Sequence, residues 1–595
     1  MLPRASRAGD ATPLYLAAQR GFTNVTAVLL EAGADPNHVM PRGAYSMQVT
    51  VAGGGSVEPL AAGGFYPERN GERGNGATAL HAAVENGHAL TAELLLSRGA
   101  RQLPSMEGVA PLLLALQYHH PHIAIALANA LPTPSPGQSH PVDATSPQDG
   151  ASALFVAAGE GYLPVVHHLL QLGATVDLPN AHGATPLSHA VHRAHLAVAS
   201  VLLEAGADPR RGPSGGGGVL HAALRAGSVR GSRLATLTEA LLGAGGGASA
   251  VDEGGTTALA LAADSGEVDT CRTLLAHGAN ASAASALPSG ITPLMRASAK
   301  GHVRVASLLI EEGRVDVDMR AGPRHHGATA LYLAAQGKHH KVLQRLLVAG
   351  AAVDAAIEQV GTTALFAAAE QGCVRSVETL VAHGADVSLP NWNGIGATHM
   401  AAMRGHVAVV RALTVGREGA AGGGSASRGG ASVPSSMPPR MPSRVPVDVR
   451  SADGSTPLIC VASGLEPLTP RRQVPMIRWL LEAGADVEAA TLDGTTALAA
   501  AASNGQAEAL KLLLTEGHAS PDATTPDDAA PGGAAPGDAA ASGVSGRRTS
   551  AIEAATRRRD VASVAALVSA GATARPQALE LAVAMREHEL ITLLS

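Results

Sequence analysis

The sequence predicts an all-α solenoid, an array of short helix pairs stacked along the chain, and three observations support this prediction. The 595 residues are 46% hydrophobic but only 2% aromatic, so the apolar residues are mostly the Ala, Leu and Val of thin, closely packed layers. Glycines recur at fixed intervals, 12 residues from Gly21 to Gly33 and 33 residues from Gly173 to Gly206. The segments between the glycines also repeat, which is the signature of a repeat array.

Each repeat reads as two helices with a defined start and end. Residues 12–37 are TPLYLAAQRGFTNVTAVLLEAGADPN, and residues 363–387 are TALFAAAEQGCVRSVETLVAHGADV. We place Thr12 at the cap of the first helix and Pro13 at the first helical position, where its missing N–H costs nothing. Glycines of the Gly21 type end the helices, where a positive φ is needed. Helices of about ten residues are marginal alone in water, so stacking of neighbours creates the fold.

This unit resembles the ankyrin repeat, whose pattern of about 33 residues has a T-P-L-H-x-A start and two short helices. The resemblance implies hairpin-like loops between units and a concave face to which partner proteins bind. A partial last unit is expected over 577–594. Before it we expect roughly fourteen units, which start near Thr12, Thr78, Ala110, Ser152, Thr185, Gly218, Thr257, Thr292, Thr329, Thr363, Gly396, Thr456, Thr496 and Ser550.

Inserts interrupt the array, mostly after the second helix of a unit. They are expected at 38–74, 131–147, 209–218, 243–253, 281–289, 416–450 and 518–547. Two further segments, 228–233 and 464–475, lengthen the link between the two helices of one unit. The segments 416–450 and 518–547 are rich in Gly, Ser, Pro and Ala and cannot bury a core, which predicts disorder.

The inserts suggest a division of the chain into domains. Whether 416–450 separates two rigid arrays or bulges from one stays open, with separation favoured. The expected organisation is N-terminal repeats over 1–130, a central array over 148–415, a linker at 416–450, a repeat pair over 451–517, a linker at 518–547 and degenerate capping repeats over 548–595.

Charge and hydropathy exclude several function classes. There are 43 basic and 49 acidic residues, which give a formal net charge of -6. The sequence therefore lacks the excess of positive charge that attracts nucleic acid. The apolar run 109–131 holds polar residues at its centre and reads as a degenerate repeat, so we expect no membrane insertion. No apolar stretch of signal-peptide length follows the first arginines, which predicts the cytoplasm, with the nucleus as the alternative.

No constellation for catalysis, cofactor binding or metal binding is found, and we expect no enzyme. The sequence at 212–216 imitates a nucleophile elbow, but no strand precedes it. Histidine at the fourth place of the repeat start is predicted to bond the capping turn, as at His81, His221 and His399. The cysteines are predicted to be small apolar fillers, at Cys271, Cys373 and Cys460.

The remaining candidate for function is the surface. The two residues after the Ala-Ala pair of each first helix are left free by the repeat pattern and vary between units. Both charge signs mix among them, which suits a protein partner better than a nucleic acid. The candidate partner-binding residues are Arg20, Glu85, Asn86, Glu160, His192, Arg193, Asp264, Lys300, Glu370, Gln371, Met403, Arg404 and Asn504.

The hypothesis from the sequence is a non-enzymatic interaction scaffold, a monomer that binds partner polypeptides along the concave face. The alternatives are a substrate-recognition or adaptor subunit of an enzyme complex, such as a ubiquitin ligase, or a fragment of a larger enzyme or channel. The sequence does not name the partner or the biological process.

Overall fold

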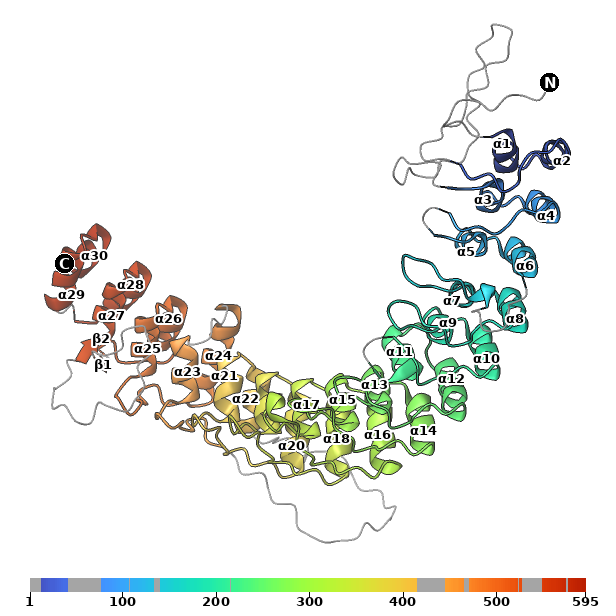
Figure 1. Ribbon diagram of the computed structural model, residues 1–595. Helices are drawn as coiled ribbons and strands as arrows, with labels where there is room; N and C mark the ends of the chain where they lie inside the picture. The colour runs from blue at the N-terminus through green and yellow to red at the C-terminus, as the bar shows by residue number, and fades with distance from the viewer. Residues whose placement is uncertain are drawn as a thin grey trace, which may run out of the picture. The chain divides into compact units, whose positions relative to one another are not determined.

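Thirty α-helices in fifteen consecutive pairs make up almost all of the regular structure among the described residues (Figure 1). This confirms the predicted all-α array of about fourteen units with a short last one. The chain divides into two compact units, residues 1–280 and 281–595. The computed structural model describes residues 12–40, 76–105, 108–132, 140–213, 216–414, 445–464, 470–522, 524–526, 548–573 and 576–595.

The first unit contains α1 to α14. The first helix of each pair packs on the first helix of the next pair, and the second helices form a parallel layer. The first helices are α1 (Pro13–Gln19), α3 (Ala79–Glu85), α5 (Pro111–Gln117), α7 (Ala153–Gly159), α9 (Pro186–His192), α11 (Gly218–Ala226) and α13 (Ala258–Ser265). The second helices are α2 (Thr23–Glu31), α4 (Ala89–Ser97), α6 (Pro121–Asn129), α8 (Leu163–Gln171), α10 (Leu196–Glu204), α12 (Ser232–Gly243) and α14 (Val268–Ala276).

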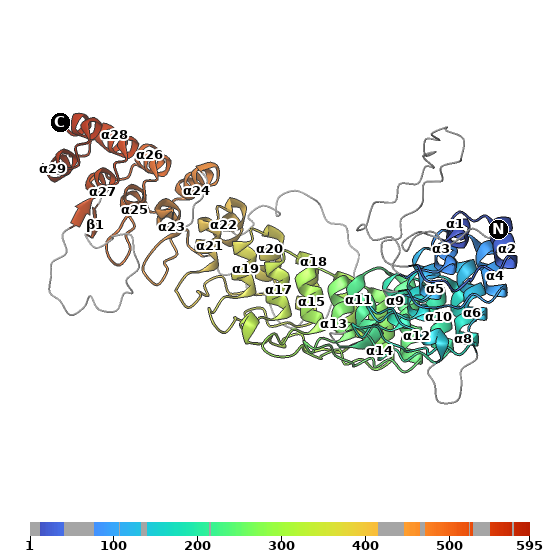
Figure 2. The ribbon, with the colours of Figure 1, turned by 45° about the horizontal axis from the view of Figure 1, so that its top comes forward.

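The second unit contains α15 to α30 in the same two layers. Figure 2 shows the layers at the C-terminal end, where α26 and α28 lie beside α25 and α27. The first helices are α15 (Pro293–Lys300), α17 (Ala330–Gln336), α19 (Ala364–Glu370), α21 (Ala397–Met403), α23 (Pro457–Ser463), α25 (Ala497–Asn504), α27 (Ala551–Arg557) and α29 (Pro576–Ala584). The second helices are α16 (Val303–Glu311), α18 (His340–Val348), α20 (Val374–Ala382), α22 (Val407–Thr414), α24 (Pro470–Glu482), α26 (Ala507–Thr515), α28 (Val561–Ser569) and α30 (His588–Leu594).

The helix starts follow from the capping residues that the sequence predicts. Thr12 Oγ1 accepts the backbone N–H of Tyr15 at 3.2 Å, and Thr363 Oγ1 accepts that of Phe366 at 3.3 Å. Each bond satisfies one of the backbone donors that a helix start leaves unpaired. Pro13 begins α1 as predicted.

The core consists of thin apolar layers between helices. Leu365 and the alanines of α19 are buried against neighbouring first helices, as are Leu498 and the alanines of α25. Small alanines allow the helices to approach closely, which explains a long chain with few aromatic residues. The apolar run 109–131 forms α5 and α6, which confirms the degenerate repeat. No helix among the described residues is long and apolar enough to span a bilayer.

Besides the α-helices, the described residues contain a few short pieces of regular structure. Two 3-10 turns, η1 (Pro141–Asp143) and η2 (Pro323–His325), lie in loops between consecutive repeats. Strands β1 (Thr524–Pro526) and β2 (Arg548–Ser550) pair antiparallel, with Thr524 opposite Ser550. This small ladder was not predicted, since its two strands lie at the ends of a segment expected to be a linker.

Four predicted segments differ from the structure or fall outside it. The link between α23 and α24 is shorter than the predicted 464–475, because α24 already begins at Pro470 and Gln473 donates its amide to Val461 O at 2.9 Å. Residues 445–450 were assigned to a linker but belong to the loop before α23. Most of the inserts predicted at 38–74, 416–450 and 518–547 lie outside the described residues.

The link predicted to be lengthened at 228–233 is present between α11 and α12. On either side of residues 415–444, α21 packs on α23. The finer division of the chain into domains stays a prediction.

Candidate partner-binding face

The predicted binding residues all occupy the last two positions of a first helix or the cap residue that follows. We call the surface that these helix ends and the following turns form the first-helix face of each unit. The exposed members are Arg20, Glu85, Asn86, His192, Arg193 and Lys300. The half-buried members are Glu160, Asp264, Glu370, Gln371, Met403, Arg404 and Asn504. Their role in binding stays a prediction.

Two of these residues are engaged by their own helix. Asn86 Nδ2 donates to Ala82 O at 2.8 Å, and Asn504 Nδ2 donates to Ala500 O at 3.1 Å. These bonds add a side-chain donor to carbonyl groups of the last helical turn, and Ala82 O also accepts the backbone N–H of Asn86. Their amides therefore contribute to helix termination as well as to the surface.

In the first unit, aromatic and acidic side chains meet on the first-helix face. Tyr118 Oη donates to Glu85 Oε1 at 3.2 Å. In the next repeats, His119 Nδ1 lies 2.7 Å from Tyr162 Oη and 3.6 Å from Glu160 Oε2. The Tyr118 side chain is 46% exposed. We call Glu85, Tyr118, His119, Glu160 and Tyr162 the tyrosine cluster.

The electrostatics of the tyrosine cluster favour a neutral phenol. Partial burial raises the pKa of Tyr162, and the nearby Glu160 carboxylate raises it further. Tyr162 therefore keeps its proton at neutral pH and can donate or accept a hydrogen bond. Tyrosines that combine an apolar body with a polar tip are common anchors in protein interfaces.

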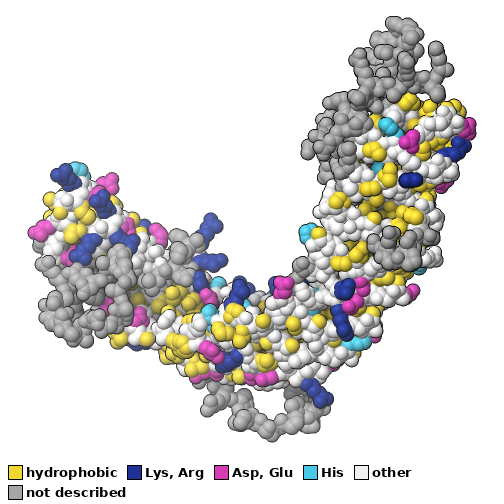
Figure 3. All heavy atoms as spheres, in the orientation of Figure 1, with side chains coloured by type: hydrophobic (Ala, Val, Ile, Leu, Met, Phe, Trp, Pro, Cys, Tyr) yellow, Lys and Arg dark blue, Asp and Glu magenta, His cyan; other side chains and the backbone are white. Residues whose placement is uncertain are grey.

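In the second unit, the first-helix face is mainly cationic. Arg404 Nη2 pairs with Glu370 Oε1 at 2.9 Å. Figure 3 shows Lys and Arg side chains on the upper edge of this unit, over α17 and α24. We call five basic residues of this face and of the adjoining start of α24 the cationic row: Lys300, Lys338, Arg404, Arg472 and Arg558.

Three residues of the cationic row lower the pKa of the same side chain, His406. Its Nε2 bonds Glu370 O at 3.0 Å. Burial lowers the pKa of His406, the bond to Glu370 O raises it, and the positive charges of Arg472, Lys338 and Arg404 lower it further. Three different repeats therefore contribute positive charge to one region of the face.

Histidines after the first helices join neighbouring repeats. His88 Nε2 donates to Gln19 O at 3.0 Å, and His339 Nε2 donates to Ala299 O at 3.1 Å. Each ring covers a glycine of the preceding repeat, where a Cβ atom would clash with it, as His339 covers Gly301. These imidazoles are structural links between repeats.

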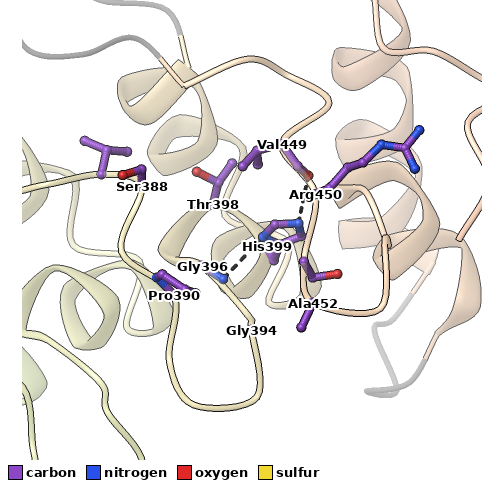
Figure 4. Close-up of a pocket in the computed structure, with 11 residues that line it drawn as sticks. Ser388, Pro390, Gly394, Gly396, Thr398, His399, Val449, Arg450 and Ala452 are labelled. Atoms are coloured by element: carbon purple, nitrogen blue, oxygen red, sulfur yellow. Dashed lines mark hydrogen bonds between the residues drawn. The ribbon is translucent and has the colours of Figure 1, made fainter. Parts of the chain in front are cut away.

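The histidines at the repeat start are also structural, which confirms their predicted bonds to the capping turn. His81 Nδ1 accepts Thr78 N–H at 3.1 Å. His399 Nδ1 accepts Gly396 N–H at 3.3 Å, and its Nε2 lies 2.9 Å from Val449 O and 3.1 Å from Ser455 O (Figure 4). Burial lowers the pKa of His399.

A hollow of about 260 Å³ adjoins His399. Its lining includes Ser388, Pro390, Thr398 and Arg450 (Figure 4). With both nitrogens of His399 bonded to backbone groups, this hollow holds no free acid or base from that side chain.

The cysteines behave as the sequence predicts at two of three positions. Burial raises the pKa of both Cys271 and Cys460 to about 12, so these thiols stay protonated and unreactive. Cys373 is half-buried at the start of α20 and accepts a hydrogen bond from Ser376 Oγ at 3.0 Å. Among the described residues, no group of three His, Cys, Asp or Glu side chains is placed to hold a metal ion.

Several face residues were missed from the sequence. Tyr118 follows the first helix of a degenerate unit that lacks the Ala-Ala pair, so the rule used to select residues skipped it. Tyr162 and Lys338 lie just beyond the two positions considered. Arg472 lies in α24, whose early start was not predicted. Aligning each unit on its first residue would have found Tyr118, which occupies the position of Arg20.

The fold and the face define a class of protein: a helical repeat array that holds its variable side chains at one end of each first helix. The family comparisons agree. A model of three consecutive ankyrin repeats matches residues 134–212, 220–321, 281–357, 315–391, 331–421 and 437–525, and a model of the single ankyrin repeat matches 10–40 and 75–103. These matches cover well over half of the chain, which belongs to the ankyrin repeat family.

Individual relatives match over part of this chain. The ankyrin repeat and KH domain-containing protein mask-1 of Caenorhabditis elegans is 35% identical over 156 residues, 26% of this chain and 6% of the relative. The E3 ubiquitin-protein ligase KEG of Arabidopsis thaliana is 30% identical over 267 residues, 43% of this chain and 16% of the relative. The B-cell lymphoma 3 protein homolog of Mus musculus is 34% identical over 111 residues, 19% of this chain and 24% of the relative. The chain thus spans less than a quarter of each of these relatives.

Proposed function

We propose that this chain is a non-enzymatic scaffold that binds partner polypeptides along its first-helix faces, which the family resemblance predicts to be concave. The observation that supports this most is the contrast within each repeat. The capping, core and linking residues recur, while the ends of the first helices carry side chains that differ between repeats. Binding surfaces set on a rigid scaffold are the usual way in which repeat arrays function.

The chemistry of the faces supports a protein partner. The first unit offers tyrosine hydroxyls beside carboxylates in the tyrosine cluster, and the second offers arginines. Tyr and Arg are enriched among the residues that dominate binding energy in protein interfaces. We place this scaffold in the cytoplasm or nucleus and propose that it acts as a monomer, which sedimentation of the purified chain would check.

The test is affinity purification from the native source with the full chain and two variants. The face variant carries Glu160→Lys, Arg193→Glu and Glu370→Lys. The control variant makes the same charge changes on exposed second-helix residues, Glu204→Lys, Arg375→Glu and Glu378→Lys. We expect a partner that the wild type and the control variant retain and the face variant loses. Partners retained equally by both variants would contradict the proposal.

A second candidate is a recognition subunit of an enzyme complex, such as a ubiquitin ligase. The similarity to the E3 ubiquitin-protein ligase KEG, which extends over 43% of this chain, favours it. If it holds, a ligase copurifies with the chain and modifies the bound partner, and the face variant abolishes that modification. A partner that binds without any copurifying ligase activity would favour the plain scaffold.

A further inference from the structure

The cationic row differs from the rest of the surface in its position and its charge. Its members come from five repeats of the second unit: Lys300 ends α15, Lys338 follows α17, Arg404 caps α21, Arg472 lies in the first turn of α24 and Arg558 caps α27. The repeats that begin with α19 and α25 contribute no member. The first helices from α15 through α27 pack on one another in order. The row therefore runs along the stack and is not a cluster on one helix.

Few carboxylates on this face neutralise the cations. Glu370 pairs with Arg404, Glu587 Oε1 pairs with Arg559 Nη1 at 2.9 Å, and the Asp560 carboxylate accepts hydrogen bonds from Ser563, so each of these acidic groups already has a partner. Lys338 and Arg472 are exposed and form no ion pair with another described residue. The positive charges of Lys338, Arg404 and Arg472 all lower the pKa of His406.

From this row we infer that the first-helix face of the second unit binds an extended acidic segment of a partner protein, whose Asp and Glu side chains pair with cations of several repeats. This inference rests on the proposed scaffold function and specifies the chemistry of one partner. Arginine suits the role because its planar donors bind a carboxylate in a bidentate way. Charge complementarity of this kind speeds association and sets the register of the bound segment.

The face favours an acidic protein segment over a nucleic acid. Single-stranded nucleic acids are bound by a basic groove together with aromatic side chains on which bases stack. In the described part of the second unit, the exposed aromatic side chain is Trp392, at 68%, in the loop between α20 and α21, away from the helix ends.

The experiment measures binding to the full chain by fluorescence anisotropy with three labelled probes. These are a peptide of alternating Glu and Gly, the corresponding peptide with Lys in place of Glu, and an oligothymidylate of the same formal charge as the acidic peptide. The test variant is Lys338→Glu with Arg472→Glu. Its matched control is Arg304→Glu with Lys341→Glu, which makes the same charge change on exposed residues of α16 and α18.

We expect the acidic peptide to bind the wild type and the control variant alike, and the test variant to bind about tenfold more weakly. Binding should also weaken with added salt, because exposed charges are screened. If circular dichroism shows that the test variant is unfolded, Lys338→Gln with Arg472→Gln replaces it, with the same direction expected.

Three results would overturn the inference: no preference for the acidic over the basic peptide, equal loss in both variants, or tighter binding of the oligothymidylate. The outcomes separate it from the scaffold proposal. A native partner lost by the face variant, with no acidic-peptide binding, would leave the scaffold proposal standing and remove this inference. Acidic-peptide binding without any native partner would leave this inference standing and remove the scaffold proposal.

Discussion

At the scale of single residues, the recurring polar side chains act on the backbone. The sequence predicted that histidine at the fourth repeat position bonds the capping turn, because short-range geometry determines that contact. It could not predict that His399 also reaches Val449 O, since residues 415–444 separate the two in the chain. Contacts across an insert depend on how the next repeat docks, which no local pattern encodes.

Buried and half-buried histidines should make the stability of the protein fall at mildly acidic pH. Burial lowers the pKa of His81, His189, His325, His399 and His406 in the folded chain. The unfolded chain binds protons near the ordinary value of about 6.5, so the free energy of unfolding is highest above that pH and declines as the pH drops below it. Melting temperatures at about pH 7.5 and about pH 5.5 check this.

The matched variant for the pH prediction is His399→Gln. It should lower stability at neutral pH by about 1–3 kcal/mol, because buried backbone groups lose a partner. Its melting temperature should also depend less on pH than that of the wild type. A pH dependence as steep as that of the wild type would show that His399 does not contribute to the acid sensitivity.

Thr398→Leu should stabilise the protein. Thr398 is 1% exposed, and its Oγ1 has no hydrogen-bond partner among the described residues. The equivalent residue of the neighbouring first helices is Leu365 or Leu458, and the hollow beside Thr398 leaves room for a larger side chain. We expect a gain of about 1–2 kcal/mol, because an unpaired buried hydroxyl is replaced by apolar contact. Thermal unfolding measures the change.

The control for this prediction is Thr363→Leu. Thr363 caps α19 with its hydroxyl, so this substitution should cost about 1 kcal/mol. If both substitutions changed the melting temperature in the same direction, the different roles assigned to the two threonines would be wrong.

At the scale of helices, the capping pattern predicted nearly every first helix, because the residues that start and stop it are adjacent in the sequence. The second helix α24 was predicted too short. Its stability depends on Gln473, which is buried against α23 and bonds Val461 O. Such tertiary support overrides local expectation, as does the pairing of β1 with β2 across a predicted linker.

The link between repeats can be tested at one glycine. Gly301 has a φ of +81°, and an added Cβ would lie 2.3 Å from His339 Nδ1. Gly350 has a similar φ of +90° but no atom within 4 Å of that position. Both changes to Ala incur the cost of a left-handed conformation, roughly 1 kcal/mol, and Gly301→Ala also displaces the linking histidine. It should therefore lower the melting temperature clearly more than Gly350→Ala, and equal effects would refute the link.

At the scale of the whole molecule, the 33-residue period was sufficient to predict the architecture, since each repeat contacts mainly its neighbours. The division at residues 280 and 281 was not predicted, and neither was the difference in charge between the two first-helix faces. The sequence showed both signs mixed along the full set of face residues. The bias appears only when the second unit is considered alone and Lys338, Arg472 and Arg558 are included.

Because each repeat packs mainly on its neighbours, a destabilising substitution should affect only the nearby repeats. Leu187 in α9 is fully buried, and α9 packs against α7 and α11. Leu187→Ala should cost about 2–5 kcal/mol at that site and raise hydrogen exchange from α7 to α12. Hydrogen exchange in α1 to α4 should stay unchanged, because repeat arrays behave as chains of adjacent interactions. Exchange that rose uniformly across residues 12–280 would instead indicate one cooperative core.

The separation between the residues that hold the stack and those at the helix ends has an evolutionary consequence. A mutation at Lys338 or Glu85 alters what the surface attracts while leaving the caps, alanine layers and linking histidines intact. Duplicated copies of such a chain can thus acquire new targets through a handful of codon changes, with little risk of losing the ability to fold.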